Sequence, residues 1–132
     1  MEDEVILIDT SILIDYFRKK DKSKAIFTSL AAEHSRLAIS VITEFEILMG
    51  SLPNQEDFWQ RVFSQLIILD FDRNCASIAS QTQKIPKKKN KIIDIPDLLI
   101  AATSISYGFR LATKNFKHFD RVENLILYQT KL

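Results

Sequence analysis

The chain has 132 residues, of which 46% are hydrophobic and 27% are charged, and these proportions are typical of a globular domain rather than a disordered chain. Lys plus Arg number 18 against 17 Asp plus Glu, and the resulting net charge of +1 excludes a strongly basic nucleic-acid coat but not a local basic patch. The single cysteine, Cys75, excludes an intrachain disulfide, and no apolar run approaches the ~18 residues of a membrane span. We therefore expect one cytoplasmic domain over residues 1–132, without a membrane segment.

Short apolar runs alternate along the chain with longer segments that contain few helix breakers. The first run, residues 5–8, is continuously apolar, which is typical of a strand buried on both faces. Similar runs predict strands at residues 37–39, 66–69, 110–113 and 125–128. The remaining segments predict helices over residues 11–35, 41–64, 73–85 and 95–107. This alternation predicts a three-layer α/β/α sandwich with a mainly parallel central sheet.

Asp9 stands where such a fold binds its ligands. Ligands of parallel α/β sheets bind beyond the carboxyl ends of the strands, and in this chain those ends are Asp9, Ser40, Asp70 and Thr113. Asp9 directly follows an apolar strand, but aspartate is also favoured as the N-cap of a following helix. A ligand role and a simple capping role are therefore both open for Asp9.

Glu46 is a second candidate, within the helix that Ser40 is expected to cap. Ile42 and Met49 lie three or four residues from Glu46, which places them on the same side of the helix. Glu44 projects roughly 160° away from Glu46, because each helical residue turns about 100°. Glu46 is thus a carboxylate on an apolar face, whereas Glu44 is expected to be an ordinary solvated acid.

Asp97 is a third candidate, in the first turn of an apolar helix that we expect to be buried. Asp94 is a good N-cap for this helix, and Asp97, three residues later, has an alternative role in closing a capping box. Both roles of Asp97 are compatible with its position.

Three buried carboxylates repel one another unless a cation lies between them. Oxygen ligands suit Mg²⁺ or Mn²⁺, whereas a zinc site favours His and Cys, of which this chain has two and one. One or two such ions can activate water for the hydrolysis of a phosphodiester. The chain has neither a Gly-x-Ser-x-Gly elbow nor a glycine-rich phosphate loop, so acyl transfer and nucleotide hydrolysis are disfavoured.

Four segments, in chain order, resemble those of the VapC-like branch of the PIN-domain family. Residues 5–15 resemble its opening strand, with Asp9 as the first acid, and residues 40–50 resemble a segment that ends in Glu-Leu-x-x-Gly, with Glu46 as the second acid. Residues 95–102 resemble its Asp-x-x-Ile-Ala-Ala helix with Asp97 as the third acid, and residues 111–119 resemble its Thr-x-Asn-x-x-Asp-Phe segment. The resemblance implies that Asp9, Glu46 and Asp97 are catalytic metal ligands, supported by Thr113 and Asn115.

The resemblance also carries expectations about fold and activity. It implies helices on both faces of a parallel sheet and a homodimer. It implies an endoribonuclease, dependent on Mg²⁺ (or Mn²⁺), that cleaves single-stranded or structured RNA with metal-activated water. Such proteins are usually the toxin of a type II toxin–antitoxin pair, so the expected partner is a cognate antitoxin protein that covers the acids.

His118 stands where the family often has an aspartate, and this departure leaves open whether one or two metal ions bind. It also keeps an alternative open, namely a catalytically weak or inactive domain that binds RNA or protein. Five lysines between Lys84 and Lys91 are expected to form a solvated loop, with contact to an RNA backbone as the second possibility. The hydroxyl groups of Thr10 and Ser11 are expected either to orient water or phosphate at the site or to cap a helix.

Overall fold

The computed structural model describes residues 4–85 and 93–129. Its strands are β1 (Val5–Ile8), β2 (Arg36–Ser40), β3 (Ile67–Leu69) and β4 (Arg110–Ala112). Its α-helices are α1 (Thr10–Arg18), α2 (Ile26–Glu33), α3 (Val41–Gly50), α4 (Glu56–Phe63), α5 (Arg73–Lys84), α6 (Ile95–Tyr107) and α7 (Phe116–Phe119). Two short 3₁₀ helices, η1 (Lys22–Lys24) and η2 (Pro53–Gln55), precede α2 and α4.

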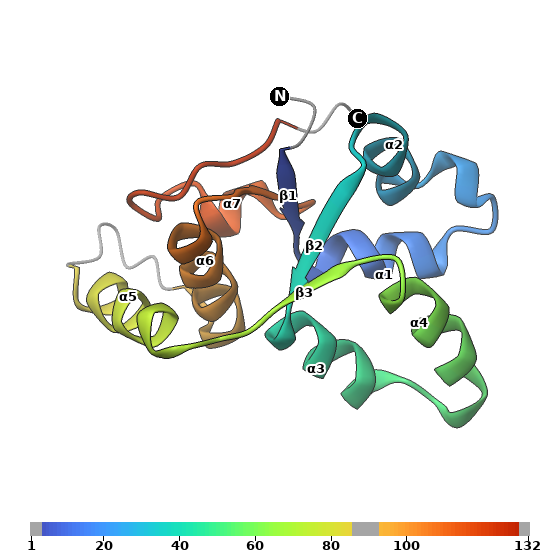
Figure 1. Ribbon diagram of the computed structural model, residues 1–132, viewed down its shortest axis with the longest axis horizontal. Coiled ribbons are helices and arrows are strands. Elements are labelled where there is room, and N and C mark those ends of the chain that lie inside the picture. The colour runs from blue at the N-terminus through green and yellow to red at the C-terminus, as the bar shows by residue number, and fades with distance from the viewer. Residues whose placement is uncertain (1–3, 86–92, 130–132) are drawn as a thin grey trace.

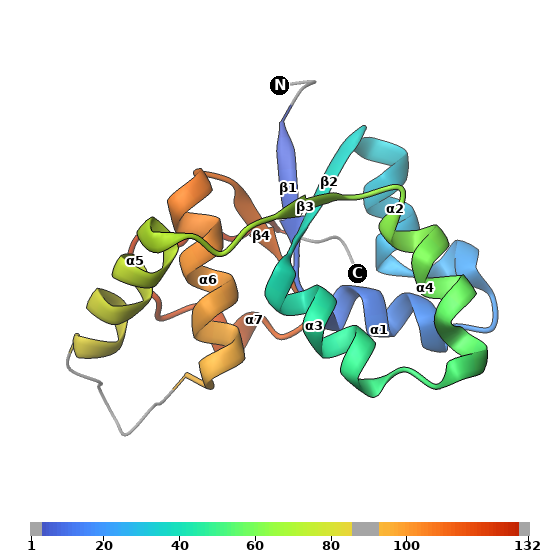
Figure 2. The ribbon, with the colours of Figure 1, turned by 60° about the horizontal axis from the view of Figure 1, so that its bottom comes forward.

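The sheet is parallel and lies between two layers of helices. In the described part of the chain it has four strands in the order β3-β2-β1-β4, and Ile6 of β1 is paired with Leu37 and Arg110. Figures 1 and 2 show α1 to α4 on one side of the sheet and α5 to α7 on the other. The predicted three-layer α/β/α sandwich is confirmed. Since the strands are parallel, their carboxyl ends lie at one edge of the sheet.

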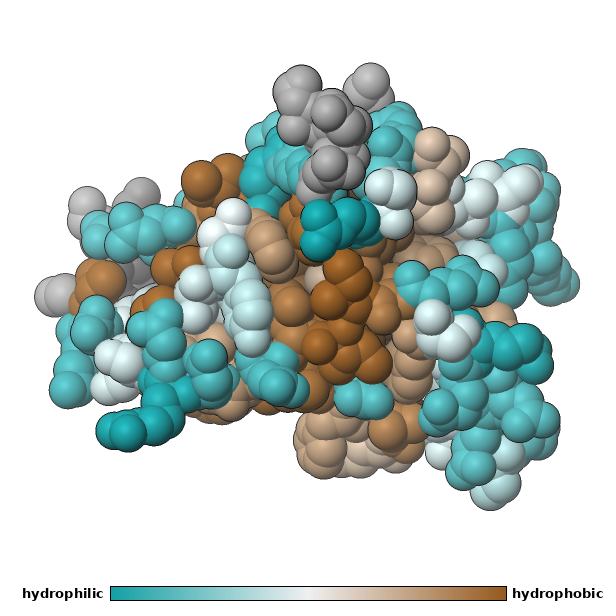
Figure 3. Space-filling view, viewed as in Figure 1, coloured by the Kyte–Doolittle hydropathy of each residue, from teal (hydrophilic) through white to brown (hydrophobic). Residues whose placement is uncertain are grey.

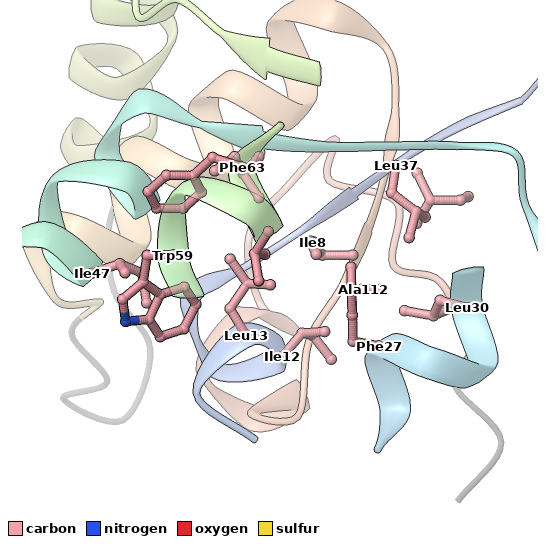
Figure 4. Close-up of a cluster of buried hydrophobic side chains, with 13 residues drawn as sticks. Ile8, Ile12, Leu13, Phe27, Leu30, Leu37, Ile47, Trp59, Phe63 and Ala112 are labelled. Carbon is pink, nitrogen blue, oxygen red and sulfur yellow. The ribbon is translucent and has the colours of Figure 1, made fainter. Parts of the chain in front are cut away.

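Alternate residues of each strand enter two separate hydrophobic cores. Ile6 and Ile8 of β1 pack among α1, α2, α3 and α4, as Figure 4 shows for Ile8. Val5 and Leu7 instead pack against α5, α6 and α7, so β1 is buried on both faces. This is the physical reason for the continuous apolarity of residues 5–8, because each face of a central strand needs its own apolar side chains.

Apolar side chains also gather on the surface around α3. Phe45 is 61% exposed and Met49 is 70% exposed, with Leu48 and Leu52 exposed beside them. Figure 3 shows apolar residues at the lower edge of the molecule, where α3 lies in Figure 1. Of the two apolar residues expected on the same side of α3 as Glu46, Met49 is therefore at the surface, whereas Ile42 is half-buried and packs against the core that contains Leu7.

The helix predicted over residues 11–35 is wrong as one continuous helix. The chain leaves helical geometry at Lys19, and η1 intervenes before α2 begins at Ile26. Lys22 ends α1 by donating hydrogen bonds to the carbonyl groups of Tyr16 at 2.9 Å, Phe17 at 3.1 Å and Lys19 at 2.8 Å. An ammonium group at these carbonyls satisfies acceptors that the end of a helix leaves unpaired.

The helix predicted over residues 41–64 also divides, into α3 and α4 with η2 between them. Pro53 opens η2, because proline lacks the N–H that the interior of a helix requires. The strands predicted at residues 37–39, 66–69 and 110–113 are confirmed to within a residue at each end, and the helices over 73–85 and 95–107 likewise.

The strand predicted at residues 125–128 is wrong in extent. Only Leu127 forms a parallel bridge, with Leu111, since β4 ends at Ala112 and offers no longer edge. The lysine-rich segment falls mostly outside the described residues, beyond the end of α5 at Lys84. No helix within the described ranges is long and apolar enough to cross a membrane.

Candidate functional site

Asp9 lies at the carboxyl end of β1, in the centre of the sheet edge, and is only 2% exposed. Its carboxylate accepts hydrogen bonds from the Ser11 hydroxyl at 2.6 Å, the Thr113 hydroxyl at 2.5 Å and the Ile12 backbone N–H at 3.3 Å. Asp9 is therefore the N-cap of α1, as one of the two expectations held. Asp9 also accepts a hydrogen bond from Thr113, more than one hundred residues away in the chain, so its contacts are not limited to capping α1.

The environment of Asp9 disfavours its negative charge. Burial raises the pKa of the Asp9 carboxyl above its ordinary value, and the charge of Asp97 adds to this rise. The hydrogen bonds from Ser11 and Thr113 act in the opposite direction. A cation beside Asp9 would relieve the unfavourable burial of the ionised form.

Backbone N–H groups of the loop after β4 bind the two hydroxyls that donate to Asp9. The Asn115 N–H donates to the Thr113 hydroxyl at 2.9 Å, and the Lys114 N–H donates to the Ser11 hydroxyl at 3.0 Å. The Asn115 side chain itself is exposed and makes no capping hydrogen bond to α7 in the described structure. Thr113 thus orients Asp9. The contacts of the Asn115 side-chain amide, by contrast, indicate neither a role at the site nor a capping role within the described residues.

Glu46 reaches the same edge from α3. The Thr10 hydroxyl donates to Glu46 Oε1 at 2.5 Å and lies 3.0 Å from the Thr43 hydroxyl. Because Thr10 follows Asp9 directly, this bond links the second predicted acid to the first through one residue. The half-buried Glu46 therefore has a partner, as a carboxylate on such a face requires.

Asp97 lies in the first turn of α6 and is half-buried. His118 Nδ1 is 3.3 Å from Asp97 Oδ2, so the residue that departs from the family pattern contacts the third predicted acid. Burial raises the pKa of Asp97, and His118 opposes this shift. Asp94 occupies the N-cap position, but its side chain makes no capping bond within the described residues, and the capping-box explanation of Asp97 is not supported.

Two further strand-end residues stay outside this group. The Ser40 hydroxyl is fully buried and accepts from the Ile42 N–H at 3.0 Å, which confirms it as the N-cap of α3. Asp70 is exposed at the end of the edge strand β3 and offers its backbone carbonyl to the Tyr107 hydroxyl. Neither residue belongs to the candidate site.

The donor chemistry fits a hard divalent cation, since carboxylate and hydroxyl oxygens surround the sheet edge. The side chains are not arranged as a ready-made cage: among residues 4–85 and 93–129, no three His, Cys, Asp or Glu side chains stand close enough together to hold a metal ion. Glu46 and Asp97 are engaged with Thr10 and His118 instead. Joint binding by the three acids therefore requires these two side chains to turn.

A polar cavity of about 240 Å³ lies beside Asp97. Its lining residues are Ile93, Asp94, Asp97, Lys117, His118 and Arg121. Sequence reasoning did not select Lys117 or Arg121, although two cations four residues apart after Asn115 were a visible signal. It also missed Asp15, a buried carboxylate that pairs with Lys114 at 3.1 Å.

The comparisons with known proteins agree with this architecture. The PIN-domain family matches the chain over residues 6–125. The chain is 36% identical to Ribonuclease VapC1 of Methanocaldococcus jannaschii, over 92% of this chain and 84% of that protein. It is 30% identical to Ribonuclease VapC2 of Rickettsia felis, over 93% and 96% of the two chains.

Solved structures give the same result. The fold is similar to that in the crystal structure of Rickettsia felis VapBC2 bound to a DNA fragment from the promoter, with a TM-score of 0.79, 30% identity, and coverage of 96% of this chain and 99% of that one. It is also similar to DNA-bound VapBC from Salmonella typhimurium, with a TM-score of 0.81, 26% identity, and coverage of 95% and 97%. The chain belongs to the PIN-domain family, in its VapC-like branch.

Proposed function

We propose that this protein is an endoribonuclease, dependent on Mg²⁺ or Mn²⁺, and the toxin of a type II toxin–antitoxin pair. The observation that carries the proposal is the buried Asp9 carboxylate at the carboxyl edge of the sheet, held by Ser11 and Thr113 and within reach of the charge of Asp97. Two relatives that share at least 30% of their residues with the chain are named ribonucleases, and this supports RNA as the substrate.

Asp9, Glu46 and Asp97 are the residues that would hold the cation. When bound, a divalent ion supplies the activation of water and offsets the charge that develops on the phosphodiester. Ser11 and Thr113 hold the Asp9 carboxylate in one orientation, whereas Glu46, which is hydrogen-bonded to Thr10, would have to turn toward the cation. Asn115, whose side chain is exposed, would donate from its side-chain amide to an oxygen of the RNA.

An antitoxin partner is part of the proposal. The similar structures from Rickettsia felis and Salmonella typhimurium are VapBC assemblies, and one from Klebsiella pneumoniae, 27% identical, is a toxin-antitoxin complex. We propose a cognate antitoxin protein and a second copy of this chain as its partners.

The central test compares two glutamates on one helix. Glu46→Gln should lower RNA cleavage at least about 100-fold, because an amide is a poor ligand for a hard cation, whereas Glu44→Gln should retain near wild-type cleavage. Cleavage of a labelled single-stranded RNA by the purified proteins, with Mg²⁺ and with EDTA, measures both effects. Thermal unfolding of each variant serves as the folding control, and equal cleavage by the two variants would contradict the assignment of Glu46.

A second candidate function is an inactive domain that binds RNA or protein without cutting. The bonds that already engage Glu46 and Asp97, to Thr10 and His118, are the observation in its favour. Titration calorimetry with Mg²⁺ separates the two functions. Heat of binding at millimolar Mg²⁺ that Asp9→Asn removes supports the nuclease, whereas an absence of heat in the wild-type protein favours the binding module.

A further inference from the structure

The cavity beside Asp97 has a composition that the three acids do not account for. Lys117 on α7 and Arg121 just after it contribute two positive charges, and Asp94 and Asp97 contribute two negative charges. In the proposed function Asp97 shares its charge with a divalent cation. The balance inside the cavity then becomes positive, which is the condition for holding an anion.

Lys117 and Arg121 both have hydrogen-bond donors that a ligand could use. Lys117 is exposed, and its ammonium has no ion-pair partner in the part of the chain that the structure describes. Arg121 uses Nη1 for the Lys117 carbonyl and for Asp120, each at 3.1 Å. These bonds fix the direction of the guanidinium while its Nε and Nη2 groups make no hydrogen bond within the described residues.

We propose that Lys117 and Arg121 form a subsite for a backbone phosphate of the RNA, flanking the bond that is cut at the acids. An arginine fork and a lysine point charge are the groups that proteins use for phosphates. Lys117 and Arg121 line the same cavity as Asp97, so a strand bound at this subsite would pass beside the third acid. The inference rests on the proposed function. It implies that the RNA strand runs from the three acids toward α7.

The test measures binding of a fluorescein-labelled single-stranded RNA by fluorescence anisotropy over a series of salt concentrations. All proteins keep the three acids, and Ca²⁺ replaces Mg²⁺ so that a divalent cation is present while the RNA stays intact, which a gel of the recovered RNA checks. Lys117→Gln and Arg121→Gln are compared with matched charge-neutralising controls, Lys20→Gln beyond the far end of α1 and Arg61→Gln on α4, across the sheet.

Each subsite variant should weaken binding roughly three- to tenfold and reduce the slope of log affinity against log salt by about 0.7, the value for one contact to a single strand. Each control should change neither quantity. If the subsite variants and their controls behave alike while the wild-type protein cleaves the same RNA, the subsite is wrong and the proposed function stands. If the wild-type protein neither binds nor cleaves RNA, the proposed function fails, and the subsite with it.

Arg121→Gln removes two hydrogen bonds to the protein itself, and a loss of folding would imitate a loss of binding. Lys117→Gln removes no ion pair among the described residues and decides the question if Arg121→Gln melts at a lower temperature. A weaker affinity of Lys117→Gln without a change of salt slope would also overturn the proposal, because a lost phosphate contact must release fewer counterions.

Discussion

Asp15 is a buried carboxylate outside the candidate site, yet it holds that site together. It pairs with Lys114 at 3.1 Å and with Lys19 at 3.5 Å, and it accepts a hydrogen bond from the Ile26 N–H at 3.2 Å. The backbone of Lys114 in turn donates to the Ser11 hydroxyl that binds Asp9. Asp15 therefore connects the loop after β4 to α1. Through Lys114 and Ser11 it also helps to keep Asp9 in position.

Asp15→Asn should lower the free energy of unfolding by about 2–3 kcal/mol at pH 7, because the buried carboxylate that accepts hydrogen bonds from Lys114 and the Ile26 N–H loses its charge. Burial acts to raise the pKa of Asp15, but the Ile26 N–H and Lys114 outweigh burial and hold the pKa below its ordinary value. The contribution of Asp15 is therefore complete above the ordinary Asp value of about 3.9 and is lost as the pH falls through the lower folded value. Urea unfolding should show a difference from wild type that narrows below about pH 4.

Lys19→Gln is the comparison for this prediction. Lys19, just beyond the end of α1, has an exposed side chain and makes the longer contact with Asp15, at 3.5 Å, so its removal should change stability by about 0.5 kcal/mol. A loss for Asp15→Asn that is the same at pH 7 and at acid pH would mean that packing, not the ion pair, carries the effect.

At the scale of elements, the ends of the helices fix the positions of the residues at the carboxyl edge of the sheet. Ser40 caps α3 and Asp9 caps α1, so both helices begin at the sheet edge where the acids lie. Gly108 ends α6 with φ of 74°, the left-handed conformation that glycine adopts without strain, and the chain then turns directly into β4. The position of Thr113 at the end of β4 depends on this turn.

The two glycines of the chain should respond to alanine in opposite directions. Among the residues that the structure describes, no neighbouring atom lies within 4 Å of a Cβ added at either position, so the backbone conformation decides the effect of alanine. Gly108→Ala should destabilise the protein by about 1 kcal/mol, because alanine is strained at positive φ. Gly50→Ala, in the last turn of α3, should stabilise it by up to about 1 kcal/mol. Thermal unfolding measures both, and a stabilised Gly108→Ala would contradict the argument.

At the scale of the whole molecule, large apolar side chains are exposed on α3 and just after it. Phe45, Leu48, Met49 and Leu52 are all more than 40% exposed. A group of large, exposed apolar side chains such as this one is typical of a protein interface. The proposed homodimer gives these residues a partner of matching chemistry.

Met49→Lys should therefore shift the protein from dimer to monomer, because a dimer would bury the added charge against an apolar surface. Light scattering coupled to size-exclusion chromatography measures the mass of both proteins at the same concentration. Lys24→Glu, an exposed change of charge on η1, should leave the dimer intact. A wild-type protein that is monomeric at all concentrations would refute the dimer.

The sequence by itself determined the fold class, because apolar periodicity reports which faces of each element are buried. Residues 5–8 already indicated a strand buried on both faces, and the helix predicted over residues 95–107 has the same bounds as α6. The four family-like segments likewise identified the PIN-domain family, which the comparison over residues 6–125 confirms. The ligand roles of Asp9, Glu46 and Asp97 stay predictions.

Only the tertiary structure decided which groups face one another. Side-chain hydrogen bonds join positions up to 104 residues apart, from Thr113 to Asp9, between His118 and Asp97, and from Lys114 to Asp15. Local patterns encode burial and propensity, whereas such contacts depend on how the elements pack, and no short window of sequence contains that information.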